Sequence, residues 1–443
     1  MVPKSVLIAN RGEIAIRIIR AAAELGIRTV AVFSEDDAGS LHTVKADEAR
    51  QLRGVGAAPY LDAEQIVAAA QQAGCELIHP GYGFLSENAA FARRCAQAQI
   101  AFAGPRPEIL DLFGDKIQAR ALAHRCGVPV LAATAGAASL EQAAEFFLAQ
   151  GAGASVMVKA VAGGGGRGMR AVHQLEDLEA SYQRCQSEAR SAFGNGDVYV
   201  ERLMPSARHI EVQILGDRSG EVTHLWEREC TIQRRHQKLV EAAPSPGITP
   251  ALRDRLTDAA IRIAQTVRYD NLGTFEFLVD ASGGDDAEFA FIEANPRLQV
   301  EHTVTEEITG VDLVKTQLLL TAGRTLAELG LRRADLPSPR GFAIQLRINA
   351  ESMAADGTTR PSGGKISAFE PPSGPGIRVD TCAHTGYAAN PRFDSLIAKL
   401  IARSSSPDFA DVVTKAYRAL CEFRIEGVAT NVGFLQTLLK HPD

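Results

Sequence analysis

The sequence has no long hydrophobic run. No stretch of its 443 residues approaches the length of about 18 uncharged apolar residues that a transmembrane helix needs. The N-terminal segment meets Arg11 and Glu13 too early to contain the apolar core of a secretory signal peptide. We therefore expect a cytoplasmic protein that does not associate with membranes.

Closely spaced cysteines and two common motifs are also missing. The seven cysteines are widely spaced without any C-x-x-C pair, and the ten histidines show no zinc-binding spacing. Such cysteines are typical of reduced thiols in a cytosolic protein. The dinucleotide fingerprint G-x-G-x-x-G does not follow the first expected strand, where Asn10-Arg11-Gly12-Glu13 stands instead. These absences exclude a disulfide scaffold and disfavour a nicotinamide-dependent oxidoreductase.

An excess of positive charge is missing as well. Lys and Arg number 47 against 53 Asp and Glu, which gives a net charge of −6. Bulk charge of this sign does not favour nucleic-acid binding. Hydrophobic residues make up 46% and charged residues 23% of the chain, which is typical of a folded protein. At about 150 residues per domain, the length suggests about three domains.

Strands and helices alternate in the N-terminal region. Strands are expected at 6–9, 29–33, 77–79 and 100–103, and a helix at 13–25 is ended by Gly26. This alternation predicts an α/β domain with a parallel sheet. The segments 10–13 and 79–83 (His-Pro-Gly-Tyr-Gly) follow strands, at the sheet edge where ligands commonly bind. Plain turn chemistry explains them equally well.

A glycine-rich hairpin is expected in the middle of the chain. Strands at 156–159 and 169–172 flank segment 163–168, which holds five glycines in six residues. It is not a Walker A loop, but backbone N–H groups without neighbouring Cβ atoms can approach phosphate oxygens closely. We favour a mobile phosphate-binding loop over a flexible surface turn.

Two acidic residues lie on consecutive expected strands. Glu276 alternates with Phe275 and Phe277, and Glu293 ends the strand 289–293. If the strands form a hairpin, both carboxylates and the amide oxygen of Asn295 converge. Two carboxylates, a carbonyl oxygen and phosphates suit Mg²⁺ or Mn²⁺. Either residue alone is better explained as a solvated strand face.

Two polar segments complete the candidate site. Segment 295–302 (Asn-Pro-Arg-Leu-Gln-Val-Glu-His) offers Arg297 for a small anion and Glu301 as a general base. Segment 233–238 (Gln-Arg-Arg-His-Gln-Lys) is a basic patch that suits a small anionic substrate in an acidic chain. For each segment, a solvated polar surface remains the alternative.

Taken in order, these motifs resemble the biotin carboxylases of the ATP-grasp ligases. The resemblance covers nearly the whole chain and rests on residues 6–13, 79–88, the glycine segment, 233–238, 293–302, 347–351 (Arg-Ile-Asn-Ala-Glu) and 394–399 (Asp-Ser-Leu-Ile-Ala-Lys). It implies a mixed α/β (α+β) fold of three parts. These are a Rossmann-like N-terminal domain at 1–115, an ATP-grasp domain at 116–330 with a lid at about 131–203, and a C-terminal domain at 331–443.

The resemblance also implies a role for individual residues. ATP phosphates would be bound by Lys116, Lys159, Gly165 and Gly166, and the adenine by the hinge Glu201, Arg202, Leu203 and Met204. His209, Gln233 and His236 would belong to the nucleotide site, and Glu276, Glu293 and Asn295 would bind the metal. Bicarbonate would be bound by Lys238, Arg297, Gln299 and Val300. Glu301 would be the base, and Arg347 would stabilise the biotin enolate.

The implied activity is the ATP- and bicarbonate-dependent carboxylation of biotin through carboxyphosphate. ATP with Mg²⁺ or Mn²⁺ would be used, biotin would arrive on a carrier protein or domain, and a carboxyltransferase would take the product. A homodimer is implied too. The chain has no Ala-Met-Lys-Met biotinylation signature, so we expect either a separate subunit or the first part of a longer carboxylase. The final carboxyl acceptor is not predicted.

Departures and rival functions remain to be weighed. Arg202 replaces a common lysine with retention of charge, and Thr303 replaces a common proline, which we expect to loosen the loop that carries Glu301. Carbamoyl-phosphate-forming or peptide-ligating enzymes would share the metal pair and glycine loop. A catalytically silent ATP-binding module is disfavoured because it needs no base.

Overall fold

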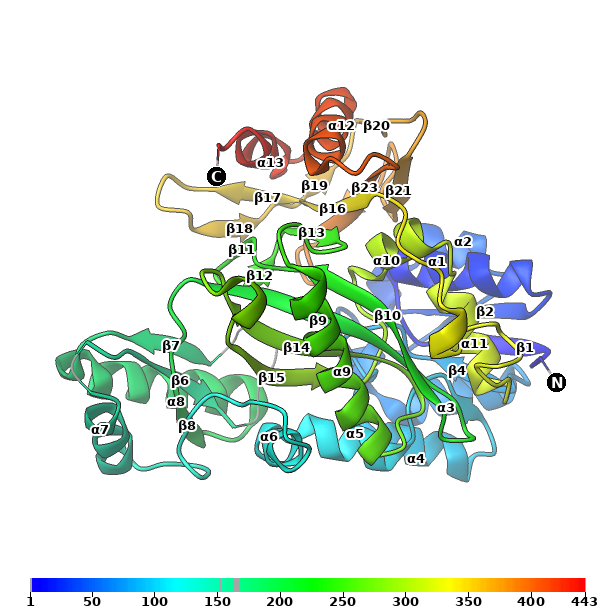
Figure 1. Cartoon of the computed structure of the whole chain (residues 1–443). Helices are drawn as coiled ribbons and strands as arrows, with labels where there is room; N and C mark the ends of the chain where they lie inside the picture. The colour runs from blue at the N-terminus through cyan, green and yellow to red at the C-terminus, as the bar shows by residue number, and fades with distance from the viewer. Residues whose placement is uncertain (1, 152, 162–167, 443) are drawn as a thin grey trace.

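A computed structural model describes residues 2–151, 153–161 and 168–442 of the chain. Figure 1 shows an N-terminal α/β unit, a central antiparallel sheet, a small unit at one end of that sheet, and a C-terminal region above it. None of the described helices combines the length and apolarity needed to cross a membrane. The mixed α/β architecture agrees with the predicted fold class.

The N-terminal sheet is parallel, as the strand–helix alternation predicts. Its order is β3-β2-β1-β4-β5. The strands are β1 (Ser5–Ile8), β2 (Arg28–Phe33), β3 (Glu48–Gln51), β4 (Leu77–His79) and β5 (Ala101–Phe102). The helices are α1 (Gly12–Glu24), α2 (Leu41–Lys45), α3 (Ala63–Gln72), α4 (Ala89–Gln97) and α5 (Pro107–Gly114). Both candidate loops, 10–13 and 79–83, leave the carboxyl ends of the neighbouring strands β1 and β4.

An eight-stranded antiparallel sheet forms the centre of the molecule. Its order is β15-β14-β9-β10-β13-β16-β23-β21. The strands are β9 (Ala207–Gly216), β10 (Val222–Glu229), β13 (Val240–Ala243), β14 (Asn271–Asp280), β15 (Phe289–Asn295), β16 (Phe342–Asn349), β21 (Ile377–Thr381) and β23 (Leu396–Ser404). The sheet therefore runs without interruption across residue 330, where the sequence predicts a domain boundary. The boundaries at 115 and 330 stay predictions.

The alternation along β14 separates the core from the site. Phe275 and Phe277 are fully buried and belong to one apolar cluster with Leu256 and Ala260 of α9 (Pro250–Thr266). Because successive strand residues point to opposite faces, Glu276 lies on the other face. One face of the sheet is thus filled by α9, and the opposite face presents polar side chains.

The unit at the end of the central sheet matches the expected hairpin. Its sheet has the order β7-β6-β8, with antiparallel pairing of Lys159 and Met169. It consists of β6 (Val156–Ala160), β7 (Met169–Val172), β8 (Val198–Arg202), α7 (Leu140–Ala149) and α8 (Leu178–Phe193), and we call it the lid. Helix α6 (Lys116–Arg125) precedes it. Gly165 and Gly166 lie outside the described residues.

The remaining α-helices and short strand pairs lie outside the sheets described above. The helices are α10 (His302–Thr309), α11 (Leu313–Thr321), α12 (Phe409–Glu422) and α13 (Val432–Leu439), of which the last two form the expected final pair. The short strands are β11 (Gln233–Arg234), β12 (Gln237–Lys238), β17 (Glu351–Met353), β18 (Thr359–Pro361), β19 (Gly364–Lys365), β20 (Ala368–Glu370), β22 (Ala388–Ala389) and β24 (Arg424–Glu426). The hairpin β11–β12 carries the basic segment 233–238.

Candidate active site

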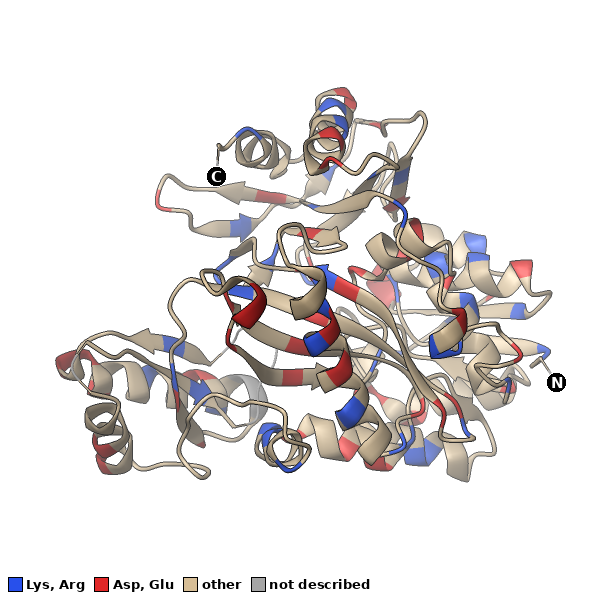
Figure 2. Ribbon diagram, viewed as in Figure 1, with Lys and Arg blue, Asp and Glu red and all other residues tan. Residues whose placement is uncertain are grey.

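The two predicted acidic residues face each other. Strands β14 and β15 form an antiparallel pair in which Glu276 is opposite Glu293 and Thr274 is opposite Asn295. Acidic bands cross both strands in Figure 2. The Nδ2 atom of Asn295 donates to Glu276 Oε1 at 2.9 Å, and Lys116 Nζ lies 3.1 Å from Glu293 Oε2. The predicted hairpin is confirmed, with Glu293 opposite Glu276. The Asn295 amide, however, presents its nitrogen to Glu276, whereas its oxygen accepts from Arg297.

Lys238 is the central cation of the site. Its Nζ donates to three carboxylates: Glu211 at 2.6 Å, Glu276 at 2.9 Å and Glu301 at 2.7 Å. Burial alone lowers the pKa of Lys238, but these carboxylates outweigh it and hold the pKa well above its usual range. The side chain therefore stays charged, and it can offer that charge to an incoming anion.

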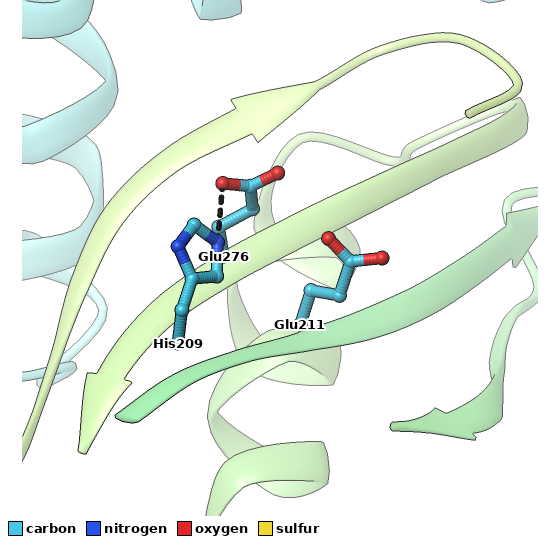
Figure 3. A group of neighbouring side chains, drawn as sticks. All are labelled: His209, Glu211 and Glu276. Carbon is cyan, nitrogen blue, oxygen red and sulfur yellow. Dashed lines mark ion pairs between the residues drawn. The ribbon is translucent and has the colours of Figure 1, made fainter. Parts of the chain in front are cut away.

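His209 and Glu211 extend the acidic cluster along β9 (Figure 3). His209 Nε2 lies 2.7 Å from Glu276 Oε2, and ligand atoms of His209, Glu211 and Glu276 all lie within 4.8 Å of one another. Burial raises the pKa of Glu276, but Lys238 and His209 reverse the shift and hold it well below its usual range. Sequence reasoning missed Glu211, although its two-residue spacing from His209 puts both side chains on one strand face.

Glu301 lies between two cations at the start of α10. Its Oε1 accepts from Lys238, and its Oε2 accepts from Arg347 at 3.1 Å. Burial raises the pKa of Glu301, but Lys238 and Arg347 more than offset it and lower the pKa below its usual range. Arg347 in turn donates from Nε to Glu241 Oε1 at 2.5 Å. Glu241, which sequence reasoning missed, fixes the direction of the guanidinium.

The other predicted bicarbonate residues line the same site. Arg297 donates to Asn295 Oδ1 at 2.9 Å, and its Nε lies 2.8 Å from Glu87 Oε1. Gln299 donates from Nε2 to Glu276 Oε1 at 3.0 Å, and its Oε1 accepts from Arg228 at 3.1 Å. Arg228 has no exposed surface and also bonds Glu211 and three further side chains: Gln213, Thr274 and Thr305. It was missed from the sequence, and it orients the Gln299 amide.

The predicted phosphate lysines lie beside acidic partners. Lys116 pairs with Glu293, and Lys159 Nζ donates to Glu201 Oε1 at 2.6 Å. Glu201 is only 1% exposed and also pairs with Arg120. Its carboxylate is therefore committed to these cations. A contact with an adenine would have to use the backbone around 201–204.

The remaining predicted nucleotide residues divide between two segments. Gln233 Nε2 lies 3.1 Å from His209 Nδ1, and burial lowers the pKa of His236, which lies in a left-handed turn. The hinge residue Arg202 ends β8, and its Nη2 atom lies 3.5 Å from Glu288 Oε2. The backbone N–H of Leu203 donates to the carbonyl oxygen of Ser155 at 2.9 Å. Met204 follows beyond the strand. The structure thus brings Gln233 to His209 and keeps the hinge at the lid.

Thr303 lies in the segment that we expect to be looser than in relatives with proline, and that expectation stays a prediction. Thr303 is fully buried inside α10, and its hydroxyl donates to Gln345 Oε1 at 2.5 Å. Gln345 donates in turn to Glu241 at 3.0 Å. The hydroxyl of Thr303 thus makes a contact that proline could not make.

Carboxylates on paired strands, two lysines from α6 and the lid, and the buried charges around Lys238 are the arrangement expected of an ATP-grasp ligase. Residues 2–110 match the model "Biotin carboxylase, N-terminal domain", 115–329 match "Carbamoyl-phosphate synthase L chain, ATP binding domain", and 345–443 match "Biotin carboxylase C-terminal domain". The chain belongs to the biotin carboxylase family.

Individual relatives agree with this assignment. The chain is 50% identical to mitochondrial pyruvate carboxylase of Mus musculus over 99% of its own length, but it spans only 37% of that enzyme. The biotin carboxylase domain of a single-chain bacterial carboxylase is 51% identical to this chain, with a TM-score of 0.87. The match covers 99% of this chain and 94% of the chain of that structure. The biotin carboxylase domain dimer of Hydrogenobacter thermophilus 2-oxoglutarate carboxylase is 42% identical, with a TM-score of 0.93, over 100% of this chain and 95% of that one. That structure is a complex with MgADP, ADP and bicarbonate.

Proposed function

We propose that the chain carboxylates biotin with ATP and bicarbonate, as the first half-reaction of a biotin-dependent carboxylase. The observation that carries the proposal is the position of Glu301 between Lys238 and Arg347. This pairing offers a base, an anion-binding cation and a second cation for a developing oxyanion within one pocket. A phosphate-binding module alone needs none of these groups.

In the first step, Lys238 and Arg297 hold bicarbonate next to Glu301. Glu301 takes the bicarbonate proton, and the oxygen that is released attacks the γ-phosphorus of ATP. The bond between that phosphorus and the bridging oxygen of ADP breaks, so the products are carboxyphosphate and ADP. Lys116 and Lys159 stabilise the negative charge that shifts among the phosphate oxygens. The low pKa of Glu301 keeps it ionised and ready to accept the proton.

A divalent cation fits the paired carboxylates. Glu276 is held ionised, Glu293 is opposite it, and the Asn295 amide lies beside both. Oxygen donors of this kind suit Mg²⁺ or Mn²⁺. When bound, the ion would neutralise phosphate charge. Lys116 and His209 currently balance these carboxylates and can turn toward phosphates instead.

In the second step, Arg347 acts on biotin. Carboxyphosphate breaks down to CO₂ and phosphate, and the phosphate removes the proton from biotin N1′. Arg347, oriented by Glu241, stabilises the enolate oxygen of the ureido ring while N1′ attacks CO₂. The lid excludes water, which would otherwise hydrolyse carboxyphosphate.

Partners follow from the reaction. We propose that biotin arrives on a carrier protein or domain and that a carboxyltransferase component takes up the carboxybiotin. A homodimer is supported by the dimer of the Hydrogenobacter thermophilus domain. A cytoplasmic location is supported by the seven free thiols, five of which are buried.

The test is ATP cleavage that depends on both bicarbonate and free biotin. Glu301→Gln should lower the bicarbonate-dependent rate by about 10²- to 10⁴-fold, the usual contribution of a general base. Arg347→Ala should abolish carboxybiotin formation. Glu108→Gln, at a carboxylate that is 70% exposed, is the matched control and should behave as wild type. Wild-type rates in both site variants, or ATP cleavage that ignores biotin, would refute the proposal and favour a carbamoyl-phosphate-forming or peptide-ligating enzyme.

A further inference from the structure

The loop 10–13, to which sequence analysis assigns either turn chemistry or ligand binding, joins two other motifs. Asn10 Nδ2 donates to the carbonyls of Pro80 at 2.7 Å and Tyr82 at 2.8 Å, which fixes the loop 79–83. Glu13 in the first turn of α1 is 4% exposed and accepts from the Tyr82 hydroxyl. The other oxygen of Glu13 does not face solvent, because a lysine from the C-terminal region covers it.

That lysine is Lys399 of β23. Its side chain has no exposed surface, and its Nζ lies 3.0 Å from Glu13 Oε2. The same Nζ donates to the carbonyl oxygen of Val300 at 3.1 Å. Lys399 therefore connects the N-terminal unit to the residue that immediately precedes Glu301.

The register of the central sheet puts Lys399 next to Arg347. The two residues are opposite each other on the antiparallel strands β16 and β23, so their side chains leave the same face of the sheet. Arg347 holds the Glu301 carboxylate, and Lys399 holds the Val300 carbonyl. These two cations, on adjacent strands of one sheet, thus bind consecutive residues of the loop that carries the base.

The surroundings of Lys399 indicate a specific role for its ammonium group. Ile401, two residues further along the same strand face, is buried and packs against Val304 and Ile308 of α10. An apolar side chain at 399 would continue this packing, whereas a buried ammonium costs several kcal/mol of desolvation. The fold could therefore do without the Glu13–Lys399 pair if both charges were replaced together, but the carbonyl of Val300 would then lose its donor.

We propose that Lys399 is a positioning residue for bicarbonate activation and that Glu13 is its counterion. The inference rests on the proposed function. Lys399 holds the peptide between Val300 and Glu301, so it sets the distance from the base to bicarbonate without touching either substrate. Removal of this bond moves the base loop, and a displacement of about 1 Å in such a loop costs up to about 10²-fold in rate.

The experiment separates positioning from stability. Lys399→Met removes the donor but leaves Glu13 buried without a partner, so its stability falls. The double variant Glu13→Gln/Lys399→Met removes both charges and keeps an acceptor for Tyr82, so much of the stability returns. We expect the double variant to retain wild-type affinity for ADP and to keep its kcat/KM for bicarbonate lowered by about 10- to 100-fold.

The matched control is Lys415→Met. Lys415 also donates to a backbone carbonyl of β23, that of Arg403 at 2.7 Å, but on the side of α12. It should leave the bicarbonate kinetics unchanged. A double variant with recovered stability and wild-type kcat/KM for bicarbonate would overturn the proposal.

A second variant covers the case of poor folding. The variant Glu13→Gln/Lys399→Leu also removes the donor and both charges but places a different apolar side chain at 399, and wild-type bicarbonate kinetics in this variant would equally overturn the proposal. A wild-type chain without bicarbonate-dependent ATP cleavage would instead refute the proposed function, and the positioning role with it.

Discussion

Lys238 Nζ and Glu301 Oε1 lie 2.7 Å apart in a pocket that leaves only 13% of the lysine side chain and 3% of the glutamate side chain exposed. The pairing keeps Glu301 ionised, because its pKa is held below the usual range. A carboxylate of low pKa is a weak base. In the proposed reaction, the acidity of bicarbonate therefore has to rise as well, and Lys238 and Arg297 would supply the charge that raises it. The same cations that weaken the base strengthen its substrate as an acid.

Loss of Lys238 should destabilise the protein. In Lys238→Met, three buried carboxylates lose their shared cation, and we expect the free energy of unfolding to fall by about 3–5 kcal/mol near neutral pH. Without Lys238, the carboxylate pKa values rise, so the folded state takes up protons and the deficit shrinks toward pH about 4. Urea unfolding at both pH values measures the effect. Lys365→Met, at an exposed lysine, is the control, and an equal deficit at both pH values would contradict the prediction.

Glu293 should control stabilisation by metal. Addition of Mg²⁺ to the ADP-bound chain should raise the thermal midpoint, and EDTA should reverse the rise; binding at a hundredfold excess over Kd is worth about 2.7 kcal/mol. Glu293→Gln should lose most of this increment and retain the increment from ADP alone. Glu288→Gln, at a carboxylate that is 75% exposed, should retain both. An undiminished magnesium increment in Glu293→Gln would remove that residue from the metal site.

Stability should depend on pH through a histidine far from the reaction. His42 is fully buried, and burial lowers its pKa to about 4, although Asp37 acts in the opposite direction. In the unfolded chain, the imidazole of His42 titrates near pH about 6.5. Between pH about 4 and 6.5, the unfolded chain therefore binds more protons than the folded chain, and the free energy of unfolding falls as the pH drops through that window. Between pH about 7 and about 5.5, the loss from this group is about 1 kcal/mol.

His42→Gln should remove that part of the pH dependence. Urea unfolding gives the free energy of unfolding at each of the two pH values. The difference between these two free energies should be smaller in the variant than in wild type by about 1 kcal/mol, whatever the overall stability of the variant. His124→Gln replaces an exposed histidine and should leave the difference as it is. An unchanged difference in His42→Gln would show that folding does not lower the pKa of His42.

The basic hairpin should depend on a pair of opposite charges. Arg234 of β11 donates to both carboxylate oxygens of Glu351, at 2.7 and 2.9 Å, and so ties the hairpin that carries Lys238 to the strand after Arg347. Arg234→Glu places two anions side by side, and we expect kcat/KM for bicarbonate to fall by about 10²-fold. The exchange Arg234→Glu/Glu351→Arg should recover part of the loss. No recovery in the exchanged pair would count against a positioning role.

Local patterns predicted much of the site. The alternation around Glu276 and the end of the strand at Glu293 were sufficient to predict a hairpin with converging carboxylates, and the structure has it. The parallel N-terminal sheet was likewise predictable from strand–helix alternation. In each case, the decisive contacts join segments that are close in sequence or that repeat a simple period.

Contacts between distant segments were not predictable in this way. Arg228 meets Gln299, and Glu241 meets Arg347, because strands far apart in the chain become neighbours in the central sheet. No periodic pattern within one segment of the sequence predicts such a pairing. Glu211 was the exception, since its spacing from His209 was visible in the sequence.

The uninterrupted central sheet decides which parts of the enzyme can move during a turnover. The strands that carry Glu276, Arg347 and Lys399 belong to one hydrogen-bonded sheet, so they form a single rigid unit. Among the described residues, the lid sheet shares no strand pairing with the central sheet. Arg202 of β8 lies 3.5 Å from Glu288, next to β15, and Val130, between α6 and α7, forms an isolated bridge with Phe291 of β15. We therefore propose that any opening and closing during turnover is confined to the lid. Glu276 and Arg347 would then keep their relative positions on the central sheet throughout the reaction.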